Sequence, residues 1–404
     1  MERYALMEDL LMAYYEARKH KRNTHNQLCF ELSLEAEITS LTSEILERCY
    51  ELRPSIAFII DDPVKREIFA ADFRDRVVHH LIFNYLNPIL DAQFIDDSYS
   101  CRKGKGTHYG IQQMAGFMQE CSGNYTKDCY VLKLDIKGYF MSMNKYLLKA
   151  KLFRLIENGR LKIENESLHN HFQLITYLLD KVIFNDPRMN CIIRGRKSDW
   201  EGLPPSKSLF HSAEGCGLPI GNLTSQLFSN VYLHDFDLFV KNVLGVKYYG
   251  RYVDDFVLIH RDKTFLLDMI GKIRQYLLEH SALTLHPNKI YLQHYSKGFA
   301  FLGAYIKPYR IYIGNRTKKK FLLILRNVGV ENIQPQNRAK YLSPLQIRAV
   351  LNSYLGIMGH YKTYNIRRKA LLNKNHLFFR YGYLEGGLKK FILTKNILYG
   401  NNFR

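Results

Sequence analysis

The chain has 404 residues, 47% of them hydrophobic and 24% charged. This composition excludes a globally disordered protein and predicts two or three packed units, at ~100–200 residues per domain. Lysine and arginine number 58 and aspartate and glutamate 38, which gives a net charge of +20. Such a surplus favours a polyanionic partner, most commonly nucleic acid, although charge alone also fits a basic surface without a specific ligand.

The cysteines and the apolar segments indicate the compartment. The chain has seven cysteines, an odd number at irregular spacing with no CxxC pair, which argues against a disulfide framework or a zinc ribbon. Charged residues within the first eleven positions argue against a signal peptide. No uncharged apolar run approaches ~18 residues, so no membrane span is expected. We therefore expect a cytoplasmic protein with no membrane partner.

The first third of the chain is expected to be mainly helical. Apolar residues at helical spacing predict one helix within the first 20 residues. A second helix begins near Ile38 and stops at Arg53-Pro54. A third runs from about Asp75 to Leu86 and ends at Asn87-Pro88, because the residue before a proline disfavours the helical conformation.

A glycine-containing basic loop follows at residues 101–108. It resembles a phosphate-binding loop only superficially, because no glycine precedes Gly104-Lys105 at the required spacing. Two interpretations stay open: a flexible loop that contacts a nucleic-acid backbone, or a solvated turn.

The middle of the chain alternates strands and helices. We expect a buried strand over 130–135, irregular structure over 185–217, a helix after 217–226, and a strand–turn–strand unit over 247–260. A helix over 264–278 and strands near 283–285 and 300–306 follow. Beyond a boundary near residue 310 the chain becomes basic and helices dominate, one of them opened by a capping box at Ser343-Pro344-Leu345-Gln346.

The strongest chemical signal is Tyr252-Val253-Asp254-Asp255. Two adjacent carboxylates stand in an apolar context, where an unpaired carboxylate costs several kcal/mol or becomes neutral. A compensating cation is therefore expected, and oxygen-rich sites of this kind suit Mg²⁺. The alternative is a solvated hairpin turn, because aspartate is a common turn residue.

Asp135 is the natural third ligand, at the end of its own apolar strand. Two metal ions ~3.5–4 Å apart can activate a 3′-hydroxyl and stabilise a leaving pyrophosphate, if carboxylates from separate strands converge on them. Successive side chains of a strand point to opposite faces. If Asp254 faces the ions squarely, Asp255 is therefore expected to contribute less directly.

Several segments, in this order, resemble the motifs of reverse transcriptases. They are Arg53-Pro54-Ser55, 65–80, 134–140, 217–230, 251–260, 283–289 and 301–303. The resemblance implies an α+β right-hand polymerase with fingers, an antiparallel-sheet palm and a helical thumb. It divides the chain into an N-terminal extension and fingers (1–125), a palm (126–310, with a fingers-associated insertion at about 180–225) and a thumb (311–404).

The segment 220–226 indicates which subfamily of reverse transcriptases the chain resembles. Most retroviral and group II intron enzymes have Gln-Gly-x-x-x-Ser-Pro there, whereas this chain has Ile220 in place of the glutamine and Gln226 in place of the proline. This departure resembles reverse transcriptases of diversity-generating retroelements, relatives of the group II intron enzymes. The resemblance implies synthesis of cDNA from an element-encoded template RNA, with errors at template adenines that diversify a target gene.

The same resemblance implies the partners and the site. The partners are template RNA, the cDNA or primer, deoxynucleoside triphosphates and a basic ring-forming accessory protein, in a bacterium or phage. Asp135, Asp254 and Asp255 are the expected catalytic acids. Together with Ile136 they are expected to form the metal site for two Mg²⁺ ions. The expected nucleotide-binding residues are Lys65, Arg66, Phe140, Gln226 and Lys289. The template and fidelity residues are Ile220, Gly221, Arg74 and Arg76, and the primer grip is Leu302 and Gly303.

Plainer interpretations of some residues stay open. Arg74 and Arg76 also fit ion pairs with nearby aspartates, and Phe140 and Lys289 also fit an ordinary core residue and a surface lysine. His79 and His80, adjacent on a helix, are interpreted as structural or solvated. For the whole chain, the alternatives are another bacterial reverse transcriptase, group II intron-like or phage-defence, or a catalytically silent RNA-binding protein with the polymerase fold.

Overall fold

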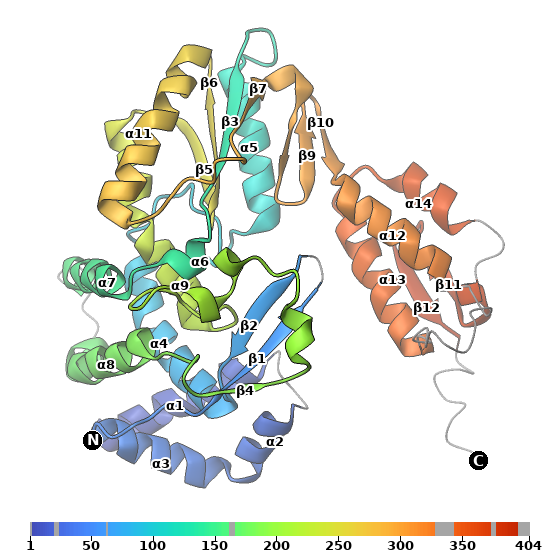
Figure 1. Ribbon diagram of the computed structural model, residues 1–404. Helices are drawn as coiled ribbons and strands as arrows, with labels where there is room; N and C mark the ends of the chain where they lie inside the picture. Colours follow the sequence, from blue (N-terminus) through green and yellow to red (C-terminus); the bar gives the residue numbers. More distant parts are fainter. Residues whose placement is uncertain are drawn as a thin grey trace. The chain divides into compact units, whose positions relative to one another are not determined.

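The computed structural model shows two compact units, each with α-helices and antiparallel strands (Figure 1). Unit 1 comprises residues 1–110 and 130–292, and unit 2 comprises residues 111–129 and 293–404. The expected mixed α+β class with antiparallel sheets is confirmed. The structure describes residues 2–19, 24–61, 64–160, 166–327, 343–372 and 377–394.

Four helices form the N-terminal part of unit 1. They are α1 (Glu2–Arg18), α2 (His25–Leu32), α3 (Leu34–Leu46) and α4 (Phe73–Asp91), and α1 packs along both α3 and α4. The second predicted helix ends earlier than expected, at Leu46. Arg48 has a positive φ of 56°, and the amides of Cys49 and Tyr50 both donate to the Glu44 carbonyl, which turns the chain out of the helix.

Helix α4 contains a proline that was expected to end it. The helix continues through Pro88 to Asp91, so the predicted end at Asn87-Pro88 is wrong. An internal proline costs about 3 kcal/mol. Ile89 and Leu90 after it are 1% and 0% exposed, and burying a side chain of this kind contributes ~1.5–3 kcal/mol. Burial therefore offsets the cost of the proline.

Unit 1 also contains a three-stranded sheet that was not predicted from the sequence. Strands β1 (Ser55–Ile60) and β2 (Arg66–Ala70) form an antiparallel hairpin, and β4 (Cys191–Ile193) pairs with β1 in parallel. The segment 185–217, expected to be irregular, therefore contains a strand as well as 3₁₀ turns. Its anchor is Glu67 of β2, 1% exposed, whose carboxylate accepts from Trp200 Nε1 and Ser208 Oγ, both at 2.7 Å.

The second sheet of unit 1 is the predicted central one. Its order is β5-β6-β3-β7, with β5 (Tyr248–Tyr252), β6 (Asp255–His260), β3 (Tyr130–Asp135) and β7 (Tyr291–His294). Helix α11 (Lys263–Ser281) packs against β6 and β3 (Figure 1). The strand expected at 283–285 is wrong, because Leu285 forms only an isolated bridge to Ile136.

The remaining helices of unit 1 pack into one core with α4. The core combines residues from distant parts of the sequence, including Leu81, Leu152, Phe228 and Phe256. The helices concerned are α6 (Tyr139–Ser142), α7 (Lys145–Arg160), α8 (Glu166–Phe184), α9 (Leu223–Tyr232) and α10 (His234–Leu238).

Unit 2 contains most of α5 (Thr107–Cys121) and a three-stranded antiparallel sheet, β8 (Phe299–Phe301), β9 (Ala304–Lys307) and β10 (Arg310–Ile313). Helices α12 (Asn315–Asn327), α13 (Pro344–Gly359) and α14 (Tyr364–Leu371) follow, as the sequence predicted. A hairpin of β11 (Gly382–Glu385) and β12 (Lys390–Leu393), which was not predicted, packs against α13.

The capping box at the start of α13 is confirmed. The Ser343 hydroxyl accepts from the Gln346 amide at 3.3 Å, and the Gln346 side chain accepts from the Ser343 amide at 2.9 Å. Among the described residues, no helix is both long and apolar enough to span a bilayer.

Candidate functional site

The three predicted catalytic acids meet at one end of the central sheet. Asp135 ends β3 and pairs directly with Asp255, the first residue of β6. Directly opposed residues have Cβ atoms roughly 4.5–5.5 Å apart and share a face of the sheet. Asp254 lies in the intervening turn, and its carbonyl accepts from the Ile136 amide at 3.3 Å. The sheet register therefore brings together acids from distant parts of the sequence.

The position of Asp255 differs from the one that strand alternation suggested. Asp254 belongs to the two-residue turn between β5 and β6, so the alternation of a regular strand does not apply to it. Asp255 instead shares the face of Asp135. The side chain of Ile136 is 1% exposed and carries no ligand atom, so only its backbone oxygen is available to a metal.

Two lysines hold the acids. Lys289 Nζ lies 2.8 and 2.9 Å from the two oxygens of Asp135, and Lys133 Nζ lies 2.8 Å from Asp255 Oδ2. Asp255 Oδ1 is buried without a hydrogen-bond partner in the described part of the chain. Within those described residues no three acid, histidine or cysteine side chains already converge as metal ligands. Each of the two directly opposed carboxylates, Asp135 and Asp255, is therefore paired with a lysine ammonium.

Burial and neighbouring charges shift the pKa values of Asp254 and Asp255. Burial, and then the Asp135 carboxylate, raise the pKa of Asp254 to about 6. Burial also raises the pKa of Asp255, although the Lys133 ammonium opposes the shift. Both acids therefore hold a proton more tightly than exposed aspartates, as expected for a site that lacks sufficient positive charge.

A buried ion pair behind the turn was missed by the sequence reasoning. Arg251 is 1% exposed and donates to Asp237, from Nε at 2.7 Å and from Nη2 at 2.6 Å. Arg251 Nη1 also donates to the carbonyl of Val253 at 3.0 Å. Val253 has a φ of 58°, a conformation that is costly for a β-branched residue. The pair therefore holds the acidic turn in a strained shape.

The sequence shows two charged residues in apolar segments, but it does not show that they lie next to each other. Arg251 is a charge next to an apolar strand, and Asp237 lies in an apolar helical stretch. Each charge needs a partner when buried. Sequence alone did not show that the two were partners.

The segment that carries Ile220 and Gly221 is attached to β2. Phe69 N donates to the Ile220 carbonyl at 3.0 Å, and Ala71 N donates to Asn222 Oδ1 at 3.1 Å. Gly221 has a φ of 125°, and a Cβ there would lie 2.9 Å from Ile68 Cγ2. Glycine at this position therefore allows the loop to approach the strand closely.

A cavity of about 310 Å³ opens beside this segment and brings together three predicted residues, Arg76, Gly221 and Gln226. Arg76 donates from Nε to the Ala71 carbonyl at 3.0 Å. Its terminal nitrogens have no partner in the described part of the chain. The other lining residues are Glu16, Ala17, His79, His80, Asn222 and Leu223.

The two histidines of this cavity are uncharged at neutral pH. Burial, aided by Arg76, lowers the pKa of His79 to about 3, and burial lowers the pKa of His80 as well. His79 Nδ1 lies 2.8 Å from Thr224 Oγ1, and its Nε2 is buried without a partner among the described residues. Arg76 is consequently the principal cationic group on the cavity wall.

Arg74 is placed differently from Arg76. It is 3% exposed and forms ion pairs with Glu37 and Glu44 of α3. Both partners are glutamates, whereas the ion-pair alternative expected nearby aspartates; one of these, Asp75, is buried and accepts from the Tyr50 hydroxyl and from the Arg53 amide. The charge of Arg74 is thus neutralised inside the helical part of unit 1.

Phe140 and Ile220 lie in one apolar cluster. Both are partly buried and pack against a core of Ala57, Phe69, Met141 and Leu209. The Phe140 carbonyl accepts from the Leu218 amide at 2.9 Å, which fixes the two segments together. The predicted nucleotide-binding residue Phe140 and the predicted template residue Ile220 therefore share one packing environment.

Lys65 and Arg66 stand where β2 begins. Lys65 Nζ donates to the Glu201 carbonyl at 2.6 Å and lies 3.8 Å from Asp61. Arg66 is exposed at the first position of the strand. Both cations lie at the outer end of the β1–β2 hairpin.

The basic loop 101–108 is partly anchored. The Arg102 side chain is 5% exposed and pairs with Asp91 at 2.5 Å. Lys105 donates to the Asp96 carbonyl at 2.6 Å. Lys103 is exposed, so only part of this basic loop is available to a ligand.

Leu302 and Gly303 form the turn between β8 and β9 in unit 2, with positive φ values of 48° and 82°. The Gly303 carbonyl accepts from Gly314 N at 2.8 Å. A side chain on Gly314 would clash with that carbonyl.

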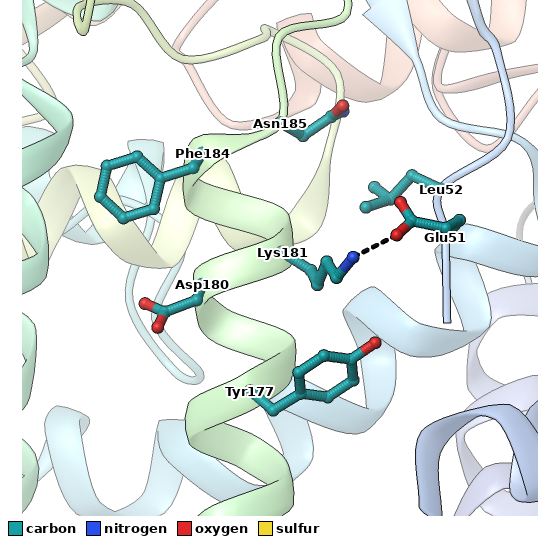
Figure 2. Close-up of a pocket in the computed structure, with 7 residues that line it drawn as sticks. All are labelled: Glu51, Leu52, Tyr177, Asp180, Lys181, Phe184 and Asn185. Atoms are coloured by element: carbon teal, nitrogen blue, oxygen red, sulfur yellow. Dashed lines mark hydrogen bonds and ion pairs between the residues drawn. The ribbon is translucent and has the colours of Figure 1, made fainter. Parts of the chain in front are cut away.

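A larger cavity, about 440 Å³, is lined mainly by residues of α8 (Figure 2). An ion pair between Lys181 and Glu51 crosses it, and Tyr177 donates to the Tyr50 carbonyl at 3.0 Å. None of the residues predicted from the sequence lines it. The lining residues are Glu51, Leu52, Tyr177, Asp180, Lys181, Phe184 and Asn185.

Comparison with known proteins gives one curated relative and several solved structures. Protein YkfC of Escherichia coli (strain K12) is 23% identical over an alignment of 312 residues, and the alignment covers 69% of this chain and 73% of YkfC. A Candida albicans telomerase complexed with a fragment of telomeric RNA has a TM-score of 0.42 and 12% identity, over 82% of this chain and 58% of the telomerase. An apo telomerase from Candida tropicalis has a TM-score of 0.44 and 13% identity, over 79% and 60%. The chain therefore spans less than two thirds of these telomerases.

The family model for reverse transcriptase (RNA-dependent DNA polymerase) matches residues 65–306, more than half of the chain. The match includes both segments that supply the predicted catalytic acids, and with the observed sheets it establishes the polymerase fold class. This chain belongs to the reverse transcriptase family of RNA-directed DNA polymerases.

Proposed function

We propose that the chain synthesises cDNA from a template RNA of its own genetic element, with errors opposite template adenines that diversify a target gene. The observation that carries the catalytic part is the meeting of Asp135 with the 254–255 turn across β3 and β6. The retroelement part is supported by Ile220 and Gln226 in the segment that borders the cavity and the apolar cluster.

The acids fit a pair of Mg²⁺ ions. Half-buried carboxylates with raised pKa values, one of them with an unpaired oxygen, need positive charge. We propose that Asp135, Asp254 and Asp255 would hold the ions, with the Ile136 backbone oxygen beside them. When bound, such ions supply activation of the primer 3′-hydroxyl and stabilisation of the leaving pyrophosphate.

Lys289 and Lys133 supply positive charge to the acids in this proposal. Each neutralises one acid in the absence of other cations. We also propose that Lys289, whose side chain is 49% exposed, protonates the leaving pyrophosphate. An ammonium that can leave Asp135 is available for a phosphate oxygen nearby.

The residues around Ile220 would position the nucleotide and the template. Phe140 would exclude the ribose 2′-hydroxyl by bulk, and Lys65 and Arg66 would contact the triphosphate. Gln226, Gly221 and Arg76 border one cavity, which suits the template strand. Ile220 can offer shape but no hydrogen bond, so mispairs incur a smaller penalty than they would beside glutamine.

The proposed partners are the template RNA and an accessory protein. A chain with a net charge of +20 would hold RNA through its phosphates, with steep weakening by salt. We also propose a basic ring-forming accessory protein that binds the enzyme, because the resemblance to diversity-generating retroelements implies one.

The test is extension of a DNA primer on a defined RNA template with Mg²⁺, followed by sequencing of the product opposite each base. We expect wild-type product with errors concentrated at adenines, and Ile220→Gln should reduce those errors while the matched Ile220→Leu retains them. Unchanged fidelity in Ile220→Gln would count against the retroelement assignment. Absence of product from folded wild-type protein would count against RNA-directed DNA polymerase activity.

A further inference from the structure

Unit 2 carries an aromatic and basic surface on the outward face of its three-stranded sheet. On β9, Tyr305 and Lys307 alternate with the buried Ala304 and Ile306, so they point outward. On β10, Arg310 and Tyr312 do the same. The register places Lys307 directly opposite Arg310, and Tyr305 directly opposite Tyr312. One row of this face is therefore basic and the next is aromatic.

The turn between β9 and β10 extends this surface. Tyr309 is 81% exposed, and its ring lies 4.4 Å from that of Tyr125, edge to face. Tyr125 in turn stacks on Tyr295 and accepts, at its carbonyl, a 2.9 Å hydrogen bond from the Tyr295 hydroxyl. Three turns of unit 2 thus converge under one exposed ring.

The exposed ring is held in place at a conformational cost. Tyr125 and Tyr309 both have positive φ values, 67° and 62°, which non-glycine residues adopt rarely. The turn that carries Tyr125 is fixed by hydrogen bonds from the amides of Thr126 and Lys127 to the Ser122 carbonyl. A large apolar ring in a rigid, strained and solvent-facing position is suited to a ligand with a flat face.

The charges around the rings are uncompensated. Like charges directly opposite each other on a sheet are destabilising, yet Lys307 faces Arg310. Lys127 and Lys297, on the two adjoining turns, are exposed as well. In the described part of unit 2 none of these four cations is paired with a carboxylate. By contrast, Lys390 on β12 faces Glu385 across its own hairpin.

The surface is separate from the predicted primer grip. Leu302 and Gly303 form the turn at one end of β9, and Tyr309 lies in the turn at the other end. Four strand residues at about 3.3 Å each separate the two turns by roughly 13 Å. A strand stacked on Tyr309 would therefore occupy a different place from a primer end at Gly303.

We propose that the surface formed by Tyr305, Lys307, Tyr309, Arg310 and Tyr312 binds single-stranded RNA. Bases would stack on the exposed rings, and phosphates would contact the cations, as sheet faces and aromatic platforms bind single strands in other proteins. Arg310 already lies 4.7 Å above the Tyr312 ring, an arrangement that a base can extend. We identify this RNA as a stretch of the template outside the copying site, and only this identification rests on the proposed function.

The test is binding of a fluorescein-labelled, unstructured 20-nucleotide RNA to the full chain, measured by anisotropy in EDTA. Tyr309→Ala with Tyr312→Ala should weaken binding by at least about 5- to 150-fold, the range for loss of one stacked base at ~1–3 kcal/mol. Lys307→Ala should reduce the slope of log Kd against log salt by about 0.7. The matched controls Tyr383→Ala, at a 50% exposed tyrosine of β11, and Lys390→Ala should bind as wild type.

Crosslinking of 5-iodouridine RNA, mapped by mass spectrometry, should label Tyr309 or Tyr312. Binding within twofold of wild type in the double variant, with no crosslink on β9 or β10, would overturn the proposal and favour a protein partner for this surface. Because no nucleotide is added in EDTA, either outcome is independent of primer extension, which tests the proposed function.

Discussion

A buried acid behind the 253–254 turn and two half-buried acids in front of it differ in how their carboxylates are satisfied. Behind the turn, Asp237 is 1% exposed and accepts from the Tyr249 hydroxyl and from Arg251, so both its oxygens are satisfied. In front of it, Asp254 and Asp255 have raised pKa values, and one Asp255 oxygen has no partner among the described residues. The difference separates an acid that stabilises the turn from two acids that we propose bind metal.

The largest expected difference between these acids is in activity. Asp135→Asn removes a proposed metal ligand worth several kcal/mol at the transition state, so primer extension should fall by at least about 1,000-fold. The midpoint of thermal unfolding should change by only a few degrees. The matched control Asp262→Asn, at the exposed N-cap of α11, should retain activity because asparagine caps helices as well as aspartate does. Extension near the wild-type rate in Asp135→Asn would contradict the assignment.

The ion pair behind the turn, between Arg251 and Asp237, should affect stability instead. Arg251→Gln leaves the Asp237 carboxylate buried without its cation, which typically costs 3–5 kcal/mol. It also releases the Val253 carbonyl. Denaturant unfolding of Arg251→Gln and Arg251→Lys should show a large loss for the first and a smaller one for the second. A loss below 1 kcal/mol in Arg251→Gln would show that this pair does not hold the turn.

The acids in front of the turn should make stability depend on pH when metal is absent. The pKa of Asp254 is raised to about 6 from its ordinary 3.8, so the folded state binds its proton more tightly than the unfolded state. Its contribution to stability is greatest below pH 4 and is lost as the pH rises through 6, by up to about 3 kcal/mol. In EDTA, Asp254→Asn should therefore gain stability relative to wild type between pH 4 and pH 7.5. An equal difference at both pH values would contradict this.

The smallest effect is expected at the lysine beside Asp255. The Lys133 ammonium lowers the pKa of that acid against the effect of burial, so Lys133→Met should raise it. The acidic limb of the extension rate should then move to higher pH, with a loss of less than tenfold at pH 8. A profile identical to that of wild type would show that Lys133 does not tune the site.

The sequence predicted the parts of the site that depend on local pattern. The apolar run before Asp135 predicted a strand that ends in a carboxylate, and the run around 254–255 predicted a strand–turn–strand unit; the structure pairs the two. The strand β4 was missed because its partner β1 lies far away in the sequence. Helix α4 passes Pro88 because burial of the residues after it, which no local rule measures, outweighs the proline.

Charged residues of one motif could not be told apart from sequence. Arg74 and Arg76 are two positions apart on α4, yet the first is neutralised by α3 and the second lines the cavity. Which helix packs on which side decides this, and that depends on tertiary contacts. The role of Arg251 was hidden for the same reason, because its partner Asp237 is on another element.

The most direct measurement is a titration with Mn²⁺, followed by electron paramagnetic resonance, of the full chain with an RNA template, a dideoxy-terminated primer and the matching nucleotide. The account predicts two bound ions in wild type, and loss of at least one in both Asp135→Asn and Asp254→Asn but not in Asp262→Asn. Two ions bound with unchanged affinity in the Asp135 and Asp254 variants would show that these carboxylates do not form the metal site.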